Sequence, residues 1–153
     1  MSNWITITIA TLNEASIAAL ITACDTAALA DNQAPRSAGL IQGVVDDIRR
    51  KVASNSKNRL DTDPTKIPKG LKGIAVTLIN AKLNIAITNE LNEDQRREVS
   101  TANQNLNRVA SGDDVVEQPD DPLPSYEEMQ TSNGVTHKAG KRKASAKKMD
   151  GLI

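Results

Sequence analysis

The chain has 153 residues, which leaves room for one domain with a modest core. It contains no Phe, one Trp and one Tyr, so the core must be built from aliphatic side chains, and this composition argues against a ring-stacking site for nucleotides or sugars. Its one histidine, His137, cannot supply a Ser/His/Asp or Cys/His arrangement or a multi-histidine metal site. We therefore expect no enzyme, no metal and no cofactor.

The net charge of zero conceals an asymmetry. Residues 1–125 carry 13 basic and 16 acidic side chains, whereas residues 126–153 carry 6 basic and 3 acidic ones. No basic region precedes an apolar run at the N-terminus, and no apolar stretch long enough to cross a bilayer is apparent. We expect a soluble protein without membrane contact, made in a reducing cytoplasm, with Cys24 as a buried inert thiol.

Apolar and hydroxyl side chains alternate from Trp4 to Ile9, which is typical of a short strand, but no partner strand is evident. The alternative is a segment that lies extended across the helices. Capping-box spacing from Thr11 to Glu14, followed by apolar residues at helical intervals, predicts a first helix over 12–30.

Three further helices follow. The second spans 36–54, with one apolar face formed by Ile41, Val44, Val45, Ile48 and Val52. Pro68 is placed to open the third helix, over 68–91, which is the most apolar and should be central. Asn92 with Gln95 starts the fourth helix, and Gly112 stops it.

These elements predict an all-α fold: a four-helix bundle-like body with a short extended N-terminal segment and a long extended C-terminal arm. The shared core should contain Leu20, Val45, Ile48, Leu71, Ile74, Leu78 and Leu106. We expect Leu78→Ala to cost about 2 to 5 kcal/mol. Between the second and third helices, Asp61 and Asp63 resemble the start of a calcium loop, but the glycine and bidentate glutamate of that loop do not follow, so turn capping beside Pro64 is preferred.

The composition changes after Gly112. We predict a helical body over 1–112, a Pro/Asp-rich linker over 113–125 and a basic arm over 126–153, because so polar a stretch cannot offset its own ordering entropy without a partner. The residues expected to bind that partner are apolar anchors and cations. They are Tyr126, Met129, Lys138, Lys141, Arg142, Lys143, Lys147, Lys148, Leu152 and Ile153.

A second basic cluster lies at the end of the second helix and in the loop that follows it. Its members are Arg49, Arg50, Lys51, Lys57 and Arg59. One reading is ordinary surface charge that complements the helix C-terminus. The other is contact with DNA in a channel or with a neighbouring subunit, which requires several copies to line a ring.

The layout resembles a family, the small all-helical head-tail connector (head completion or adaptor) proteins of tailed bacteriophages and prophages. The resemblance covers about residues 3–122. It rests on Trp4 to Thr8, Thr26 to Ala30, Leu60 to Pro68 with Leu71 and Lys72, Glu93 to Arg97, and Leu106 to Gly112. These are packing and capping features, and none is a catalytic motif.

The resemblance implies a structural protein of the virion neck, made in the host cytoplasm. Such adaptors form a ring, usually of twelve, beneath the portal after DNA packaging, and in related adaptors a C-terminal arm grips the portal. The implied partners are the portal protein, neighbouring copies, a downstream neck or tail protein and, non-specifically, packaged DNA. The competing hypothesis is a nucleic-acid-associated helical protein with a basic C-terminal arm, against which stand the acidic body and the lack of a recognisable recognition helix.

Overall fold

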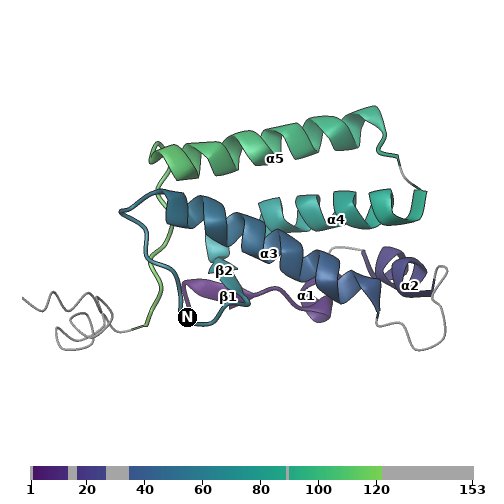
Figure 1. The fold of residues 1–153 in the computed structure, drawn as a ribbon, viewed down its shortest axis with the longest axis horizontal. Coiled ribbons are helices and arrows are strands. Elements are labelled where there is room, and N and C mark those ends of the chain that lie inside the picture. The colour runs from purple at the N-terminus through teal and green to yellow at the C-terminus, as the bar shows by residue number, and fades with distance from the viewer. Residues whose placement is uncertain (1, 14–16, 27–34, 89, 122–153) are drawn as a thin grey trace, which may run out of the picture. The chain divides into compact units, whose positions relative to one another are not determined.

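The computed structural model describes residues 2–13, 17–26, 35–88 and 90–121. This part of the chain is mostly helical, with one small two-stranded sheet (Figure 1). The order of elements is β1 (Trp4–Thr6), α1 (Ile9–Asn13), α2 (Ala18–Thr26), α3 (Arg36–Ser54), β2 (Lys66–Pro68), the 3-10 turn η1 (Lys69–Leu71), α4 (Lys72–Thr88) and α5 (Glu93–Ser111).

The N-terminal strand has a partner that the sequence did not reveal. β1 pairs antiparallel with β2, so that Ile5 lies opposite Ile67, and the main-chain N–H of Lys69 donates to the carbonyl of Asn3 (2.9 Å). Pro68 ends this strand and precedes η1, so the prediction that it opens the third helix is wrong. The backbone of Pro68 has φ −54°, a value that suits a strand end as well as a first helical turn.

The predicted first helix is wrong at its start. A short helix, α1, begins at Ile9 and contains Thr11, and α2 begins only at Ala18. The hydroxyl of Thr8, not that of Thr11, accepts the hydrogen bond of a first-turn amide, from Thr11 N–H at 3.3 Å. Glu14, the other half of the predicted capping box, lies outside the described residues.

Helix α3 has the predicted bounds and buries the predicted face. Its N-terminus receives a cap from another helix, because the carboxylate of Asp25 in α2 accepts hydrogen bonds from both the N–H (2.8 Å) and the hydroxyl (2.7 Å) of Ser37. Ser37 is thereby buried with its polar groups satisfied.

Helix α4 contacts α2, α3 and α5 (Figure 1), as predicted for a central element, but it shares this position with α3, which contacts α2, α4, α5 and β2. Contrary to the expectation from sequence, the 20-residue stretch Lys69–Thr88 contains an 18-residue window with a mean hydropathy of 1.3 and is long and apolar enough to cross a membrane by length and composition alone. Its side chains at Ala75, Ile79 and Leu83 are buried in the fold. The core helix of a soluble protein can have the same length and hydropathy, so these two properties are weak evidence that α4 spans a membrane.

Helix α5 begins and ends as predicted. Asn92 and Gln95 form a reciprocal capping box, with bonds of 2.8 and 3.1 Å, and Gly112 takes the left-handed conformation at φ 90°. One core joins the elements. Of the predicted members, Val45, Ile48, Leu71 and Leu106 are buried in it, while Leu20, Ile74 and Leu78 are half-buried against it.

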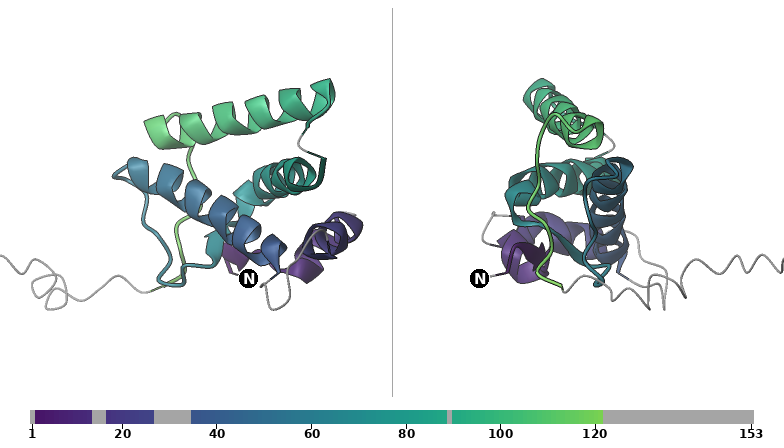
Figure 2. Two further views of the ribbon diagram at one scale, coloured as in Figure 1. Left: turned by 45° about the vertical axis from the view of Figure 1, so that its right-hand side comes forward. Right: turned by 90° about the vertical axis from the view of Figure 1, so that its left-hand side faces the viewer.

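The chain of the compact body continues past Gly112, where the predicted body ended. From there it runs back beside the two strands (Figure 2), Val116 and Pro119 are buried, and the compact unit extends to Asp121. Residues 113–121 are therefore part of the body and not of a linker. The remaining linker residues and the arm over 126–153 lie outside the described residues.

Candidate interaction surfaces

Arg49, the first member of the predicted basic cluster, holds the loop before β2. One guanidinium nitrogen, Nη1, donates to the carbonyls of Asp63 (2.9 Å) and Lys66 (2.6 Å), and Nη2 donates to the carbonyl of Asp61 (2.8 Å). The guanidinium also lies 5.5 Å from the centre of the Trp4 ring. A planar fork with five donors is suited to this geometry, so the charge of Arg49 is directed into the fold.

Arg59 holds the C-terminal segment of the body. Its Nη2 donates to the carbonyls of Pro119 (2.9 Å) and Asp121, and its main-chain N–H donates to the side chain of Gln118 (3.0 Å). Beside it, the Asp121 carboxylate accepts from the N–H (2.9 Å) and hydroxyl (2.7 Å) of Thr62. These two bonds lower the pKa of Asp121 below its ordinary value.

The same segment is tied to the N-terminus. Trp4 Nε1 donates to the carbonyl of Glu117 (2.8 Å), and the main-chain N–H of Asn3 donates to the carboxylate of Asp120 (2.8 Å). We call residues 113–121, with these contacts, the latch. The bonds that tie it to the N-terminus, to Arg59 and to Thr62 join residues far apart in the sequence, which is why composition alone made this stretch resemble a linker.

The other three members of the predicted basic cluster lie at the surface. Arg50 pairs with Asp47 at 3.1 Å, the ammonium of Lys51 donates to Asn107 at 2.8 Å, and Lys57 is exposed. The five cations therefore do not share one free surface, because two of them, Arg49 and Arg59, are bound to main-chain carbonyls of this chain. The predicted partner residues from Tyr126 to Ile153 lie outside the described residues.

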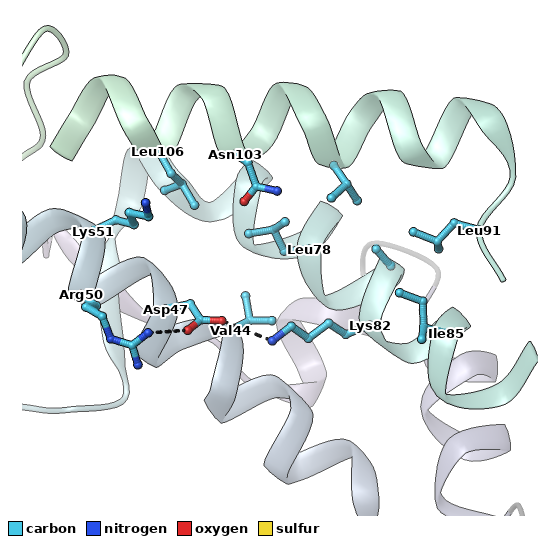
Figure 3. Close-up of a pocket in the computed structure, with 12 residues that line it drawn as sticks. Val44, Asp47, Arg50, Lys51, Leu78, Lys82, Ile85, Leu91, Asn103 and Leu106 are labelled. Carbon is cyan, nitrogen blue, oxygen red and sulfur yellow. Dashed lines mark hydrogen bonds and ion pairs between the residues drawn. The ribbon is translucent and has the colours of Figure 1, made fainter. Parts of the chain in front are cut away.

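A groove lies between α3, α4 and α5 (Figure 3). Its volume is about 360 Å³. The lining is mainly aliphatic, from Val44, Leu78, Ala81, Ile85, Leu91, Val99 and Leu106, with Asn103 and four charged residues, Asp47, Arg50, Lys51 and Lys82, around it. Figure 3 shows Asp47 joined to both Arg50 and Lys82, at 3.1 and 3.3 Å.

A second hollow adjoins this groove. Its volume is about 430 Å³, it is lined by Arg36, Leu40, Lys82, Ile85 and Ala86, and it shares Lys82 and Ile85 with the groove. Ile85 is 45% exposed although it is a large aliphatic residue at the boundary of the two hollows. The arrangement offers apolar contact within a cationic border, which suits the binding of an apolar and acidic partner.

A third hollow lies on another flank of α5, where Asn105 and Val109 meet Gly70, Leu71 and Ile74. Val115 borders it and is 92% exposed. Neither the groove nor this exposed valine was found from sequence, because both depend on how α5 lies over the other helices.

The described residues include no group of three or more His, Cys, Asp or Glu side chains that could hold a metal ion. Asp61 and Asp63 instead cap turns, as predicted: Asp61 accepts from the N–H of Asp63 (2.9 Å), and Asp63 accepts from the hydroxyl (2.7 Å) and N–H (2.9 Å) of Thr65. These last two bonds lower the pKa of Asp63. Cys24 is buried and unpaired, as predicted.

Comparisons with protein-family models, with curated proteins and with solved structures each found no match to this chain. The function must therefore be argued from the residues and from their arrangement.

Proposed function

We propose that this chain is a structural adaptor of the phage neck, which joins the portal to a downstream neck or tail protein and extends the DNA channel. One observation carries the proposal: several of the residues on which the resemblance to head-tail connectors rests make contacts that stabilise this body. Trp4 is buried and bonded to the latch, Asp61 and Asp63 cap the loop before β2, and Gly112 supplies the left-handed turn after α5.

The proposal includes the finer features of the expected fold and assembly. The helices pack as a four-helix bundle-like body, the basic arm over 126–153 is extended and binds the portal, and neighbouring copies form a ring, usually of twelve in such adaptors. The protein acts in the virion neck after synthesis in the host cytoplasm, without catalysis or a cofactor. The latch supports this view because it holds Asp121, the last residue that the structure describes before the arm, firmly on the body.

The test is portal binding by the full-length protein and by a chain truncated after Pro124, observed by electron microscopy and by co-sedimentation with purified portal rings. Truncation there keeps the latch contacts described above, so we expect a folded body with the helical content of residues 1–121. The full-length protein should decorate one end of the portal, and the truncated chain should not. Undiminished portal binding by the truncated chain would contradict the role of the arm.

The same preparation tests the competing hypothesis of a nucleic-acid-associated protein. Binding to free DNA that weakens steeply with salt, together with no binding to the portal, would favour that hypothesis and reject the adaptor. An adaptor in the neck would make only weak, non-specific contact with packaged DNA.

A further inference from the structure

The charges around the groove are unbalanced. Among its lining residues, Arg50, Lys51 and Lys82 outnumber the single carboxylate of Asp47, and the adjoining hollow adds Arg36. An occupant with carboxylates would complement this excess of cations, and an apolar side chain would complement the aliphatic lining.

The body carries a surface of that composition. Val115, 92% exposed, is flanked by Asp113 and Asp114 on one side and Glu117 on the other. We call these four residues the knob. The knob contains one of only three exposed large hydrophobic residues in the described part of the chain, the others being Ile85 in the groove and Ile9.

The backbone presents the knob in a fixed conformation. The N–H groups of Asp113 and Asp114 donate to the carbonyl of Arg108 (2.9 and 3.1 Å), and the side chain of Glu117 accepts from Gly70 N–H (3.4 Å). Val116 is buried between them. A surface already held in its binding conformation loses little entropy on association.

The knob and the groove belong to different flanks of α5. Asn103 and Leu106 line the groove, whereas Asn105 and Val109 line the hollow beside the knob. Two different complementary surfaces on one molecule lead to a head-to-tail contact between copies, and successive head-to-tail contacts close into a ring or continue as a filament.

We infer that the knob of one copy binds in the groove of the next, with Val115 against the aliphatic lining near Ile85 and the knob carboxylates against the cations around it. This inference rests on the proposed function in one respect only. A ring of copies requires a contact between neighbours, and the knob and the groove supply that contact. The second copy is the occupant because the knob matches the groove in both charge and polarity.

The test uses three full-length variants, one for each exposed large hydrophobic residue, followed by sedimentation velocity without portal. Val115→Lys removes the apolar part of the knob, Ile85→Glu places in the groove a carboxylate that repels those of the knob, and Ile9→Lys in α1 is the control. The native chain and the control should associate with rising protein concentration. Because burial of one aliphatic side chain corresponds to about a tenfold change in affinity or more, each of the other two variants should associate at least about tenfold more weakly.

A mixture of the two impaired variants gives the decisive result. Val115→Lys retains a working groove and Ile85→Glu retains a working knob, so the mixture should form pairs that grow no further. A charge exchange adds a second check: Lys82→Glu should weaken association, and Asp113→Lys in the same chain should restore it.

Three outcomes would overturn the contact: association of both variants at native strength, a mixture that rebuilds the larger native assemblies, or a native chain that stays monomeric at every concentration. Portal is absent from this experiment. A negative result would therefore reject the contact between copies and would not bear on the portal-binding test of the proposed function.

Discussion

Trp4 and Glu117 lie 113 positions apart in the sequence, yet the indole Nε1 of Trp4 donates a 2.8 Å hydrogen bond to the carbonyl of Glu117. The Trp4 side chain is 1% exposed and packs in the core, while its ring also lies beneath Arg49. The largest side chain in the body therefore joins the N-terminal strand, helix α3 and the latch.

Replacing the indole by a smaller ring without a donor should weaken this junction. We expect Trp4→Phe to lower the free energy of unfolding by about 1 to 3 kcal/mol, since the phenyl ring fills only part of the space of the indole and the Glu117 carbonyl loses its partner. Trp4→Ala should cost about 3 to 5 kcal/mol because it also leaves a cavity. Urea unfolding measures both changes, and Thr6→Val, at an exposed position of the same strand, is the control. Equal stability of Trp4→Phe and the native chain would show that the bond contributes nothing.

Two adjacent arginines allow a matched comparison. Arg49→Lys should lower the free energy of unfolding by about 1.5 to 3 kcal/mol, because a single ammonium cannot reach the carbonyls of Asp61, Asp63 and Lys66 together. Arg50→Lys changes an exposed ion pair with Asp47 and should cost under about 0.5 kcal/mol. Thermal or urea unfolding of the two variants decides the point. Similar losses would mean that the fork of Arg49 is not a stabilising feature.

The structure changes the expectation for Leu78. This residue is half-buried at the groove, whereas its neighbour Ile79 is 0% exposed. Ile79→Ala should cost about 2 to 5 kcal/mol, and Leu78→Ala should fall at or below the lower end of that range, near 2 kcal/mol, since truncation there enlarges an open groove instead of creating an enclosed cavity. Unfolding measurements on both variants test the order. A larger loss at Leu78 would contradict the helix register.

Acid should release the latch before the helices unfold. The hydrogen bonds from Thr62 lower the pKa of Asp121 in the folded chain relative to the ordinary value of 3.8, so their stabilising effect is fully present above that value and is lost as the pH falls through the lower, folded-state pKa. Asp63 contributes in the same direction. Hydrogen exchange of the amides over 113–121 should therefore accelerate below about pH 4, after correction for intrinsic rates.

Thr62→Val is the control for this effect, because it removes the hydroxyl donor and leaves the main-chain N–H. It should raise the pH at which the latch opens, toward the ordinary carboxyl value. Release of the latch at the same pH in both proteins would assign the transition to another group.

The features predicted correctly are those that depend on residues close together in the sequence. The bounds of α3 follow from its apolar periodicity, and the ends of α5 follow from the Asn92–Gln95 capping box and from the need for a left-handed residue at Gly112. Such features are decided within a few residues, so the printed sequence contains enough information to place them.

What escaped prediction depends on distant partners. The strand at Lys66–Pro68 is too short to show a period, and only its pairing with Trp4–Thr6 identifies it. In the sequence, Arg59 cannot be told apart from an ordinary surface cation. Only the structure shows that it binds the carbonyls of Pro119 and Asp121. The groove was equally invisible, since its lining comes from three helices whose relative placement no local pattern specifies.

The latch also determines how the body responds to tension. Its bonds to Asn3, Trp4, Arg59 and Thr62 are made by residues far from α5 in the sequence. A pull on the chain beyond Asp121 therefore loads these bonds first, and α5 bears force only after they have broken. The latch thus protects α5 from unfolding when force is applied at the C-terminal end of the body.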